Sequence, residues 1–66
     1  MQILLNGQPR EFAADTTLAT LLELTGYADR RVAIEINRDI APRSRFAEIL
    51  LKDGDKVEIV HAIGGG

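Results

Sequence analysis

Only one stretch of this chain has helical periodicity, and this limits the folds that it can adopt. Leu18, Leu21 and Leu22 share one helix face between candidate N-caps at residues 15–17 and Gly26, which is suited to end a helix. The flanking segments alternate apolar and polar residues, as β-strands do. One helix over about residues 17–25 covers one face of a sheet. The sequence therefore predicts an α+β fold, a mixed sheet with one bare face.

The first twelve residues predict a hairpin. Ile3 and Leu5 would face the core, and Asn6-Gly7 supplies the two positive φ angles of a tight turn. Because Pro9 has no N–H to donate, the returning strand is expected at a sheet edge. This strand would bring Phe12 back to the core.

The second half predicts the remaining strands. Residues 31–37 alternate with Val32, Ile34 and Ile36 on one face, and Arg38-Asp39 is expected to turn the chain into a short strand at 40–41. A single helical turn carrying Phe46, Ile49 and Leu50 is expected within 43–51. After a turn at 53–55, the last strand is predicted over 56–62. It would place Val57 and Ile59 on the core side and Glu58, Val60 and Ala62 on the bare side, in a sheet of four to five strands.

Composition excludes several functions. The formal net charge is −2 and the basic residues are scattered, which disfavours nucleic-acid binding. There is no cysteine, so the chain offers neither a thiolate metal site nor a cysteine nucleophile. His61 has no triad partner nearby in sequence, and Asp53 and Asp55 fall short of a calcium motif, so we expect surface and turn roles. No signal-like or membrane-spanning run is visible, and a cytoplasmic protein, monomeric when free, is expected.

The ending is the most informative segment. Ile63-Gly64-Gly65-Gly66 places three glycines where neither a turn nor a helix cap needs them. Terminal glycines are often only a flexible tail. Glycine has no Cβ, however, and a run of it makes a thin thread that passes through a channel too narrow for side chains. Residues 63–66 are therefore either a loose end or a thread that delivers a terminal carboxylate to another protein.

The whole chain resembles the thiamine-biosynthesis sulfur carriers, a branch of the ubiquitin-like β-grasp proteins. The resemblance runs through MQILLNG, TTLATLLELTG, VAIEIN followed by IAPR, and the ending DGDKVEIVHAIGGG. It implies one β-grasp domain over residues 1–66 with a tail at 63–66. The chain ends in three glycines, whereas a bulkier residue could precede the diglycine at position 64. The two positions that the chemistry requires, Gly65 and Gly66, are in place, and the extra Gly64 is a departure from the family pattern.

The resemblance implies a relay and no catalytic side chain in this chain. A ubiquitin-activating-like adenylyltransferase would use ATP and magnesium to adenylate the Gly66 carboxylate. Sulfur from a persulfide protein would then give a thiocarboxylate, and thiazole synthase would accept that sulfur. The chain is expected to be a protein co-substrate rather than an enzyme, with no bound cofactor or metal, and residues 63–65 would thread into the partner site.

Alternation also predicts a partner surface, because Leu4, Val60 and Ala62 would lie on the bare face beside the tail. Scattered surface apolar residues are equally an ordinary property of folded proteins. Arg43 and Arg45 are interpreted as solvated, with pairing to acidic partner groups as the alternative. Three alternative functions stay open: the small subunit of molybdopterin synthase, a tRNA-thiolation carrier, and a β-grasp module that binds partners without reacting.

Overall fold

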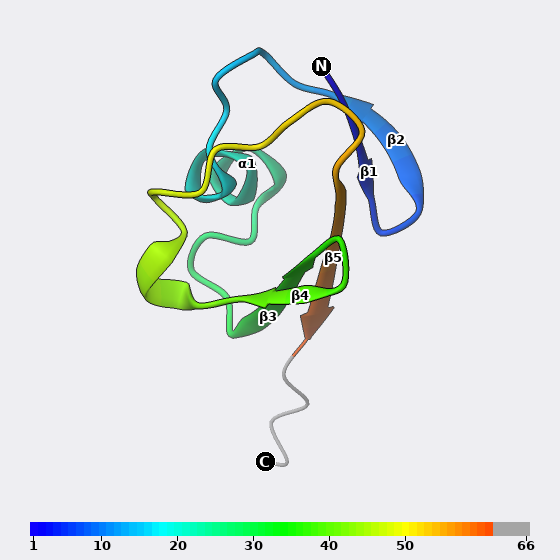
Figure 1. Ribbon diagram of the computed structural model, residues 1–66. Helices are drawn as coiled ribbons and strands as arrows, with labels where there is room; N and C mark the ends of the chain where they lie inside the picture. The colour runs from blue at the N-terminus through cyan, green and yellow to red at the C-terminus, as the bar shows by residue number, and fades with distance from the viewer. Residues whose placement is uncertain (62–66) are drawn as a thin grey trace.

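The computed structural model describes residues 1–61, which form a sheet with an α-helix packed against one face (Figure 1). The elements follow the predicted order: β1 (Gln2–Leu5), β2 (Gln8–Glu11), α1 (Leu18–Thr25), β3 (Val32–Ile36), β4 (Asp39–Ala41), the 3₁₀ turn η1 (Arg43–Arg45) and β5 (Lys56–His61). The predicted α+β class is confirmed. No helix in the described range is long and apolar enough to cross a membrane.

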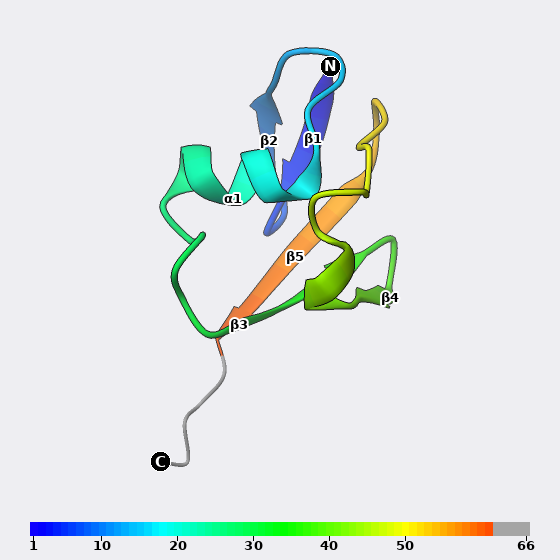
Figure 2. The ribbon, with the colours of Figure 1, turned by 90° about the vertical axis from the view of Figure 1, so that its left-hand side faces the viewer.

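The sheet is mixed and its strand order is β2-β1-β5-β3-β4. The central pair, β1 and β5, runs parallel with Leu5 opposite Val57, and the other pairs are antiparallel. Strand β2 lies at an edge, as Pro9 predicted, because a residue without an N–H fits where no further strand accepts a bond. Figure 2 shows α1 crossing in front of β1 and β2, and among residues 1–61 no helix covers the opposite face of the sheet (Figure 1).

Local chemistry fixes the turns and caps around the first strands and the helix. Asn6 and Gly7 have φ angles of 50° and 82°, the pair of positive values that a tight hairpin needs. The Thr17 side chain accepts a bond from the Thr20 N–H at 3.2 Å and caps α1. Gly26 ends the helix in the left-handed region at φ 87°. These three predictions are confirmed.

The core lies between α1 and the sheet. Its buried residues come from every strand except β2, from one face of α1, and from the segment before β5: Ile3, Leu5, Leu18, Leu21, Leu22, Val32, Ile34, Ala41, Leu51, Val57 and Ile59. Phe12 and Ile36 are half-buried against this cluster, as predicted. Alternation along β1, β3 and β5 therefore identified the core face correctly.

The turn between β3 and β4 lies one residue earlier than predicted. Asn37 and Arg38 take positive φ angles of 51° and 75°, and Asp39 already belongs to β4. The Asn37 side chain explains the shift, because its Oδ1 accepts from the Lys56 N–H at 3.0 Å and its Nδ2 donates to Asp55 Oδ1 at 3.0 Å. Asn also tolerates the left-handed region better than most residues. The prediction of a turn at Arg38-Asp39 was wrong by one position.

The segment between β4 and β5 also differs from the prediction. The predicted single helical turn is present as η1, but it spans only Arg43–Arg45, so the prediction that it carries Phe46, Ile49 and Leu50 is wrong. Instead the segment wraps around the start of α1, where the carbonyls of Phe46 and Ile49 accept the N–H groups of Ala19 and Leu18 at 3.0 and 2.9 Å. Helix N-termini leave these donors unpaired. Leu50 is 54% exposed as a result.

Candidate functional site: the open sheet face and the end of the last strand

The last strand ends at His61 at one end of the molecule (Figure 1). The residues predicted to react or to thread into a partner site, Ile63, Gly64, Gly65 and Gly66, lie outside the described residues, as does Ala62 of the predicted partner surface. The described part of the site therefore consists of the surfaces around the end of β5.

The bare sheet face carries the rest of the predicted partner surface. Val60 is 51% exposed and lies opposite Ala33 of β3, and Leu4 is half-buried opposite Lys56. Ile40 of β4, 74% exposed, extends the apolar part of this surface opposite Glu35. Ile40 was not among the residues predicted from the sequence for the partner surface. Because neighbouring residues of a strand face opposite sides, a core position for Ala41 would have placed Ile40 on the bare face. We call Leu4, Val60 and Ile40 the open-face patch.

A shallow hollow of about 310 Å³ adjoins this patch. Leu4 and Gly7 line it together with Arg38, Lys56 and Glu58. The apolar Leu4 therefore lies among charged side chains of both signs, a composition suited to protein contacts in which a polar rim surrounds an apolar centre.

His61 occupies the surface beside the loop that follows α1. Its ring lies 5.7 Å from the Tyr27 ring, centroid to centroid, at an interplanar angle of 55°. This tilted contact holds the imidazole against the loop. Within residues 1–61, no three His, Asp or Glu side chains gather as a metal site requires. The geometry therefore gives His61 a structural surface contact rather than an acid–base partner set.

Asp53 and Asp55 act as turn residues, as predicted. Asp53 Oδ1 accepts the Gln2 N–H at 2.6 Å, and Asp55 Oδ2 accepts the Lys52 N–H at 2.8 Å. The Asp55 bond is of the kind by which aspartate commonly stabilises turns, with nearby backbone as the donor. Both carboxylates therefore have structural partners: Asp53 ties the turn before β5 to the first strand, and Asp55 closes the turn itself.

The two arginines of η1 have local partners. Arg45 Nε lies 3.6 Å from Glu48 Oε1 in an exposed ion pair, and Arg43 Nη2 donates to the Arg30 carbonyl at 3.0 Å. Exposed pairs of the first kind contribute little to stability. The Arg43 bond instead connects η1 to the loop before β3, next to the end of β5.

A mixed sheet crossed by one helix, with its first and last strands parallel at the centre, places the chain in the ubiquitin-like β-grasp class. The ThiS family model matches residues 3–66, and the chain belongs to the ThiS family. It is 38% identical to the sulfur carrier protein ThiS of Escherichia coli over the full length of both chains. The crystal structure of thiamine biosynthesis protein ThiS from Geobacter metallireducens superposes with a TM-score of 0.86 at 32% identity, covering all of both chains.

A further relative is much longer. The chain is 46% identical, over all of its 66 residues, to a thiazole synthase of Paramagnetospirillum magneticum, but it spans only 20% of that protein's length. A ThiS-like unit therefore occurs within a polypeptide that is named for thiazole synthesis.

Proposed function

We propose that this protein is the sulfur carrier for the thiazole part of thiamine and that its reactive group is the carboxylate of Gly66. The observation that supports this best is the end-to-end similarity to a curated sulfur carrier. The relative named thiazole synthase supports thiazole formation over molybdopterin synthesis or tRNA thiolation as the destination of the sulfur.

The proposed relay activates a poor electrophile. In an adenylyltransferase partner, an oxygen of the Gly66 carboxylate attacks the α-phosphorus of magnesium-bound ATP, and pyrophosphate leaves. The terminal sulfur of a persulfide on a donor protein then attacks the acyl carbon and displaces AMP. A thiol cleaves the resulting acyl disulfide, which leaves a thiocarboxylate on Gly66 for thiazole synthase. The chain acts as a protein co-substrate, and its partners supply ATP, magnesium and every catalytic side chain.

The chain's own contribution is binding and delivery. The glycines at 64 and 65 and Ile63 would enter the partner's site as a thin thread. The open-face patch together with Ala62 would dock the partner and so fix where the thread enters. Holding a reactive group in place in this way replaces a random encounter by a local one.

Intact-mass spectrometry tests this proposal directly. The protein ending at Gly66 is incubated with magnesium, ATP, the activating enzyme, a persulfide source and a thiol. We expect its mass to increase by one oxygen-to-sulfur exchange, whereas variants that lack Gly66 or carry extra residues after it should not change. A variant extended beyond Gly66 that gains sulfur without trimming would contradict the mechanism. An unchanged mass for the unmodified protein would favour a β-grasp module that only binds partners.

A further inference from the structure

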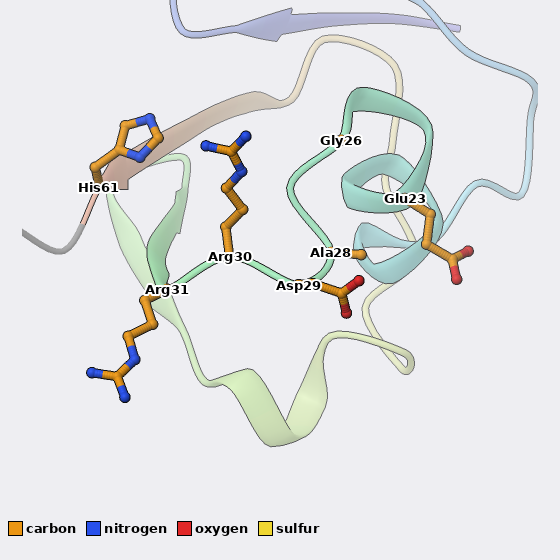
Figure 3. Close-up of a pocket in the computed structure, with 7 residues that line it drawn as sticks. All are labelled: Glu23, Gly26, Ala28, Asp29, Arg30, Arg31 and His61. Carbon is orange, nitrogen blue, oxygen red and sulfur yellow. The ribbon is translucent and has the colours of Figure 1, made fainter.

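A groove of about 580 Å³ lies beside the end of β5, on a different surface from the open-face patch. Its walls come from the end of α1, the loop at residues 27–31 and His61. Figure 3 shows that the groove is polarised: Arg30 and His61 extend from one side, whereas Glu23 and Asp29 point to the other. Arg30, Arg31 and His61, which we call the basic collar, therefore flank the point where the last strand ends.

The backbone beneath the basic collar is held firmly, although its side chains are exposed. The Tyr27 N–H donates to the Leu22 carbonyl at 2.7 Å, and the Arg30 N–H donates to the Tyr27 carbonyl at 3.1 Å. Arg43 binds the Arg30 carbonyl from η1, and the Tyr27 ring contacts the His61 ring. A surface fixed in this way loses little conformational freedom when it binds a partner.

The arginines of the collar have no structural use for their charge. The ion pair that the described residues contain joins Arg45 to Glu48, and neither Arg30 nor Arg31 pairs with a carboxylate in residues 1–61. The chain as a whole is acidic, with a net charge of −2, so two consecutive unpaired arginines stand out locally, although their side chains point in opposite directions (Figure 3). Guanidinium groups recognise carboxylates through paired hydrogen bonds, and His61 adds a ring N–H donor.

We propose that the basic collar docks an acidic surface segment of the activating enzyme, at the rim of the site that receives the chain end. This inference rests on the proposed function, because that function brings a partner to this end of the molecule. The collar would speed and orient the encounter through its charge, while the open-face patch supplies the apolar contact. No bond is made or broken at the collar.

The test is the double variant Arg30→Glu/Arg31→Glu in the intact-mass assay, run over a range of carrier concentrations. We expect the half-saturating carrier concentration to rise by about tenfold at low salt, since opposed charges accelerate association by 10-fold or more. The maximal rate should stay unchanged, and the difference should shrink as salt screens the charges. Arg30→Gln/Arg31→Gln should show a smaller rise.

The matched control is Arg10→Glu/Lys52→Glu, which changes the net charge equally at exposed positions near the other end of β5. It should behave like the unmodified protein, and circular dichroism should show that all variants are folded. Equal half-saturating concentrations for the collar and control variants would overturn the proposal that the basic collar docks the enzyme. The proposal would also be overturned if the collar variants changed the half-saturating concentration of ATP rather than that of the carrier, because the arginines would then bind nucleotide phosphates. An unmodified protein that never gains sulfur would refute the carrier function itself, a result separate from these.

Discussion

Asn6 connects two parts of the sheet that are far apart in sequence. Its Oδ1 accepts the N–H of Ile59 in β5 at 2.7 Å, and its own N–H donates to the Val57 carbonyl at 2.9 Å. Since β1 ends at Leu5, the Asn6 side chain takes over the pairing that the strand no longer provides. It does so at φ 50°, a region that Asn tolerates better than most residues.

Replacing Asn6 by Ala should therefore lower the free energy of unfolding by about 2 kcal/mol, because the partly buried Ile59 N–H loses its acceptor. Asn6→Asp is the matched control, since it keeps an oxygen in the same place and should cost much less. Chemical denaturation measures both. If the two substitutions destabilise the protein equally, the side-chain bond to Ile59 is not what matters at this position.

Only part of the role of Asn6 could be predicted from the sequence. The pair Asn6-Gly7 indicates a hairpin turn from local chemistry alone. The bond to Ile59 joins residues 53 positions apart, and no local pattern reports such a contact. The same holds for Asn37, whose bonds to Lys56 and Asp55 moved the turn by one residue.

At the scale of the element, β5 is the strand on which both the core and the proposed docking surface depend. It pairs with β1 on one side and β3 on the other, and its side chains alternate between the two faces. Val57 is fully buried against the helix side, whereas Val60 is 51% exposed on the open face. One strand therefore contributes to stability through one face and is available for binding through the other.

The two valines give a matched pair of predictions. Val57→Ala should destabilise the protein by about 2 kcal/mol, because it removes buried apolar area and leaves a cavity. Val60→Ala removes the same atoms from the surface and should change the free energy of unfolding by less than about 0.5 kcal/mol. Thermal or chemical denaturation of both variants measures the two free energies of unfolding and so tests which face of β5 each valine occupies. Similar losses in the two would mean that the faces of β5 are assigned wrongly.

Elements with a clear period were predictable, and elements placed by tertiary contacts were not. The leucine face of α1 and the alternation in β3 and β5 predicted type, approximate bounds and core face, because burial on one side imposes these periods. Residues 42–51 have no such period. Their path is set by hydrogen bonds to the start of α1 through Phe46 and Ile49, which only the folded chain brings together.

At the scale of the whole molecule, size limits how partners can bind. The described chain has an accessible surface of 4593 Å², and a typical stable interface takes about 800 Å² from each partner. The open-face patch extends along β5 from Leu4, opposite Lys56, to Val60, and the basic collar lies at the end of the same strand. An adenylyltransferase and a thiazole synthase that each need Gly66 would therefore bind one after the other, and sulfur transfer would require dissociation between the steps.

The parts of the proposed site differ in how far the sequence predicted them. The alternation in β5 predicted the bare face. The glycines at 64–66 left a loose end and a thread equally open, and only the family resemblance implied a reactive carboxylate at Gly66. The basic collar was not predicted, because Arg30 and Arg31 lie in a loop without periodicity. Their approach to His61 depends on the pairing of β3 with β5, in which Val32 lies opposite His61. Charges gathered from different elements become visible only in three dimensions.

A final prediction separates docking on the open face from folding. Val60→Asp places a charge in the open-face patch at an exposed position and should leave the protein folded. It should weaken binding to the activating enzyme by about tenfold or more, since desolvating an unpaired carboxylate in an apolar contact is costly.

The control for Val60→Asp is Leu24→Asp, which adds the same charge at a 67% exposed apolar residue of α1, on the helix side of the molecule. Calorimetry of both variants with the activating enzyme compares the two surfaces directly, and denaturation reports their stability. If Val60→Asp unfolds the protein, Val60 belongs to the core and the strand faces are inverted. If both variants bind as tightly as the unmodified protein, the partner contacts neither position, and docking must rely on the basic collar and the chain end alone.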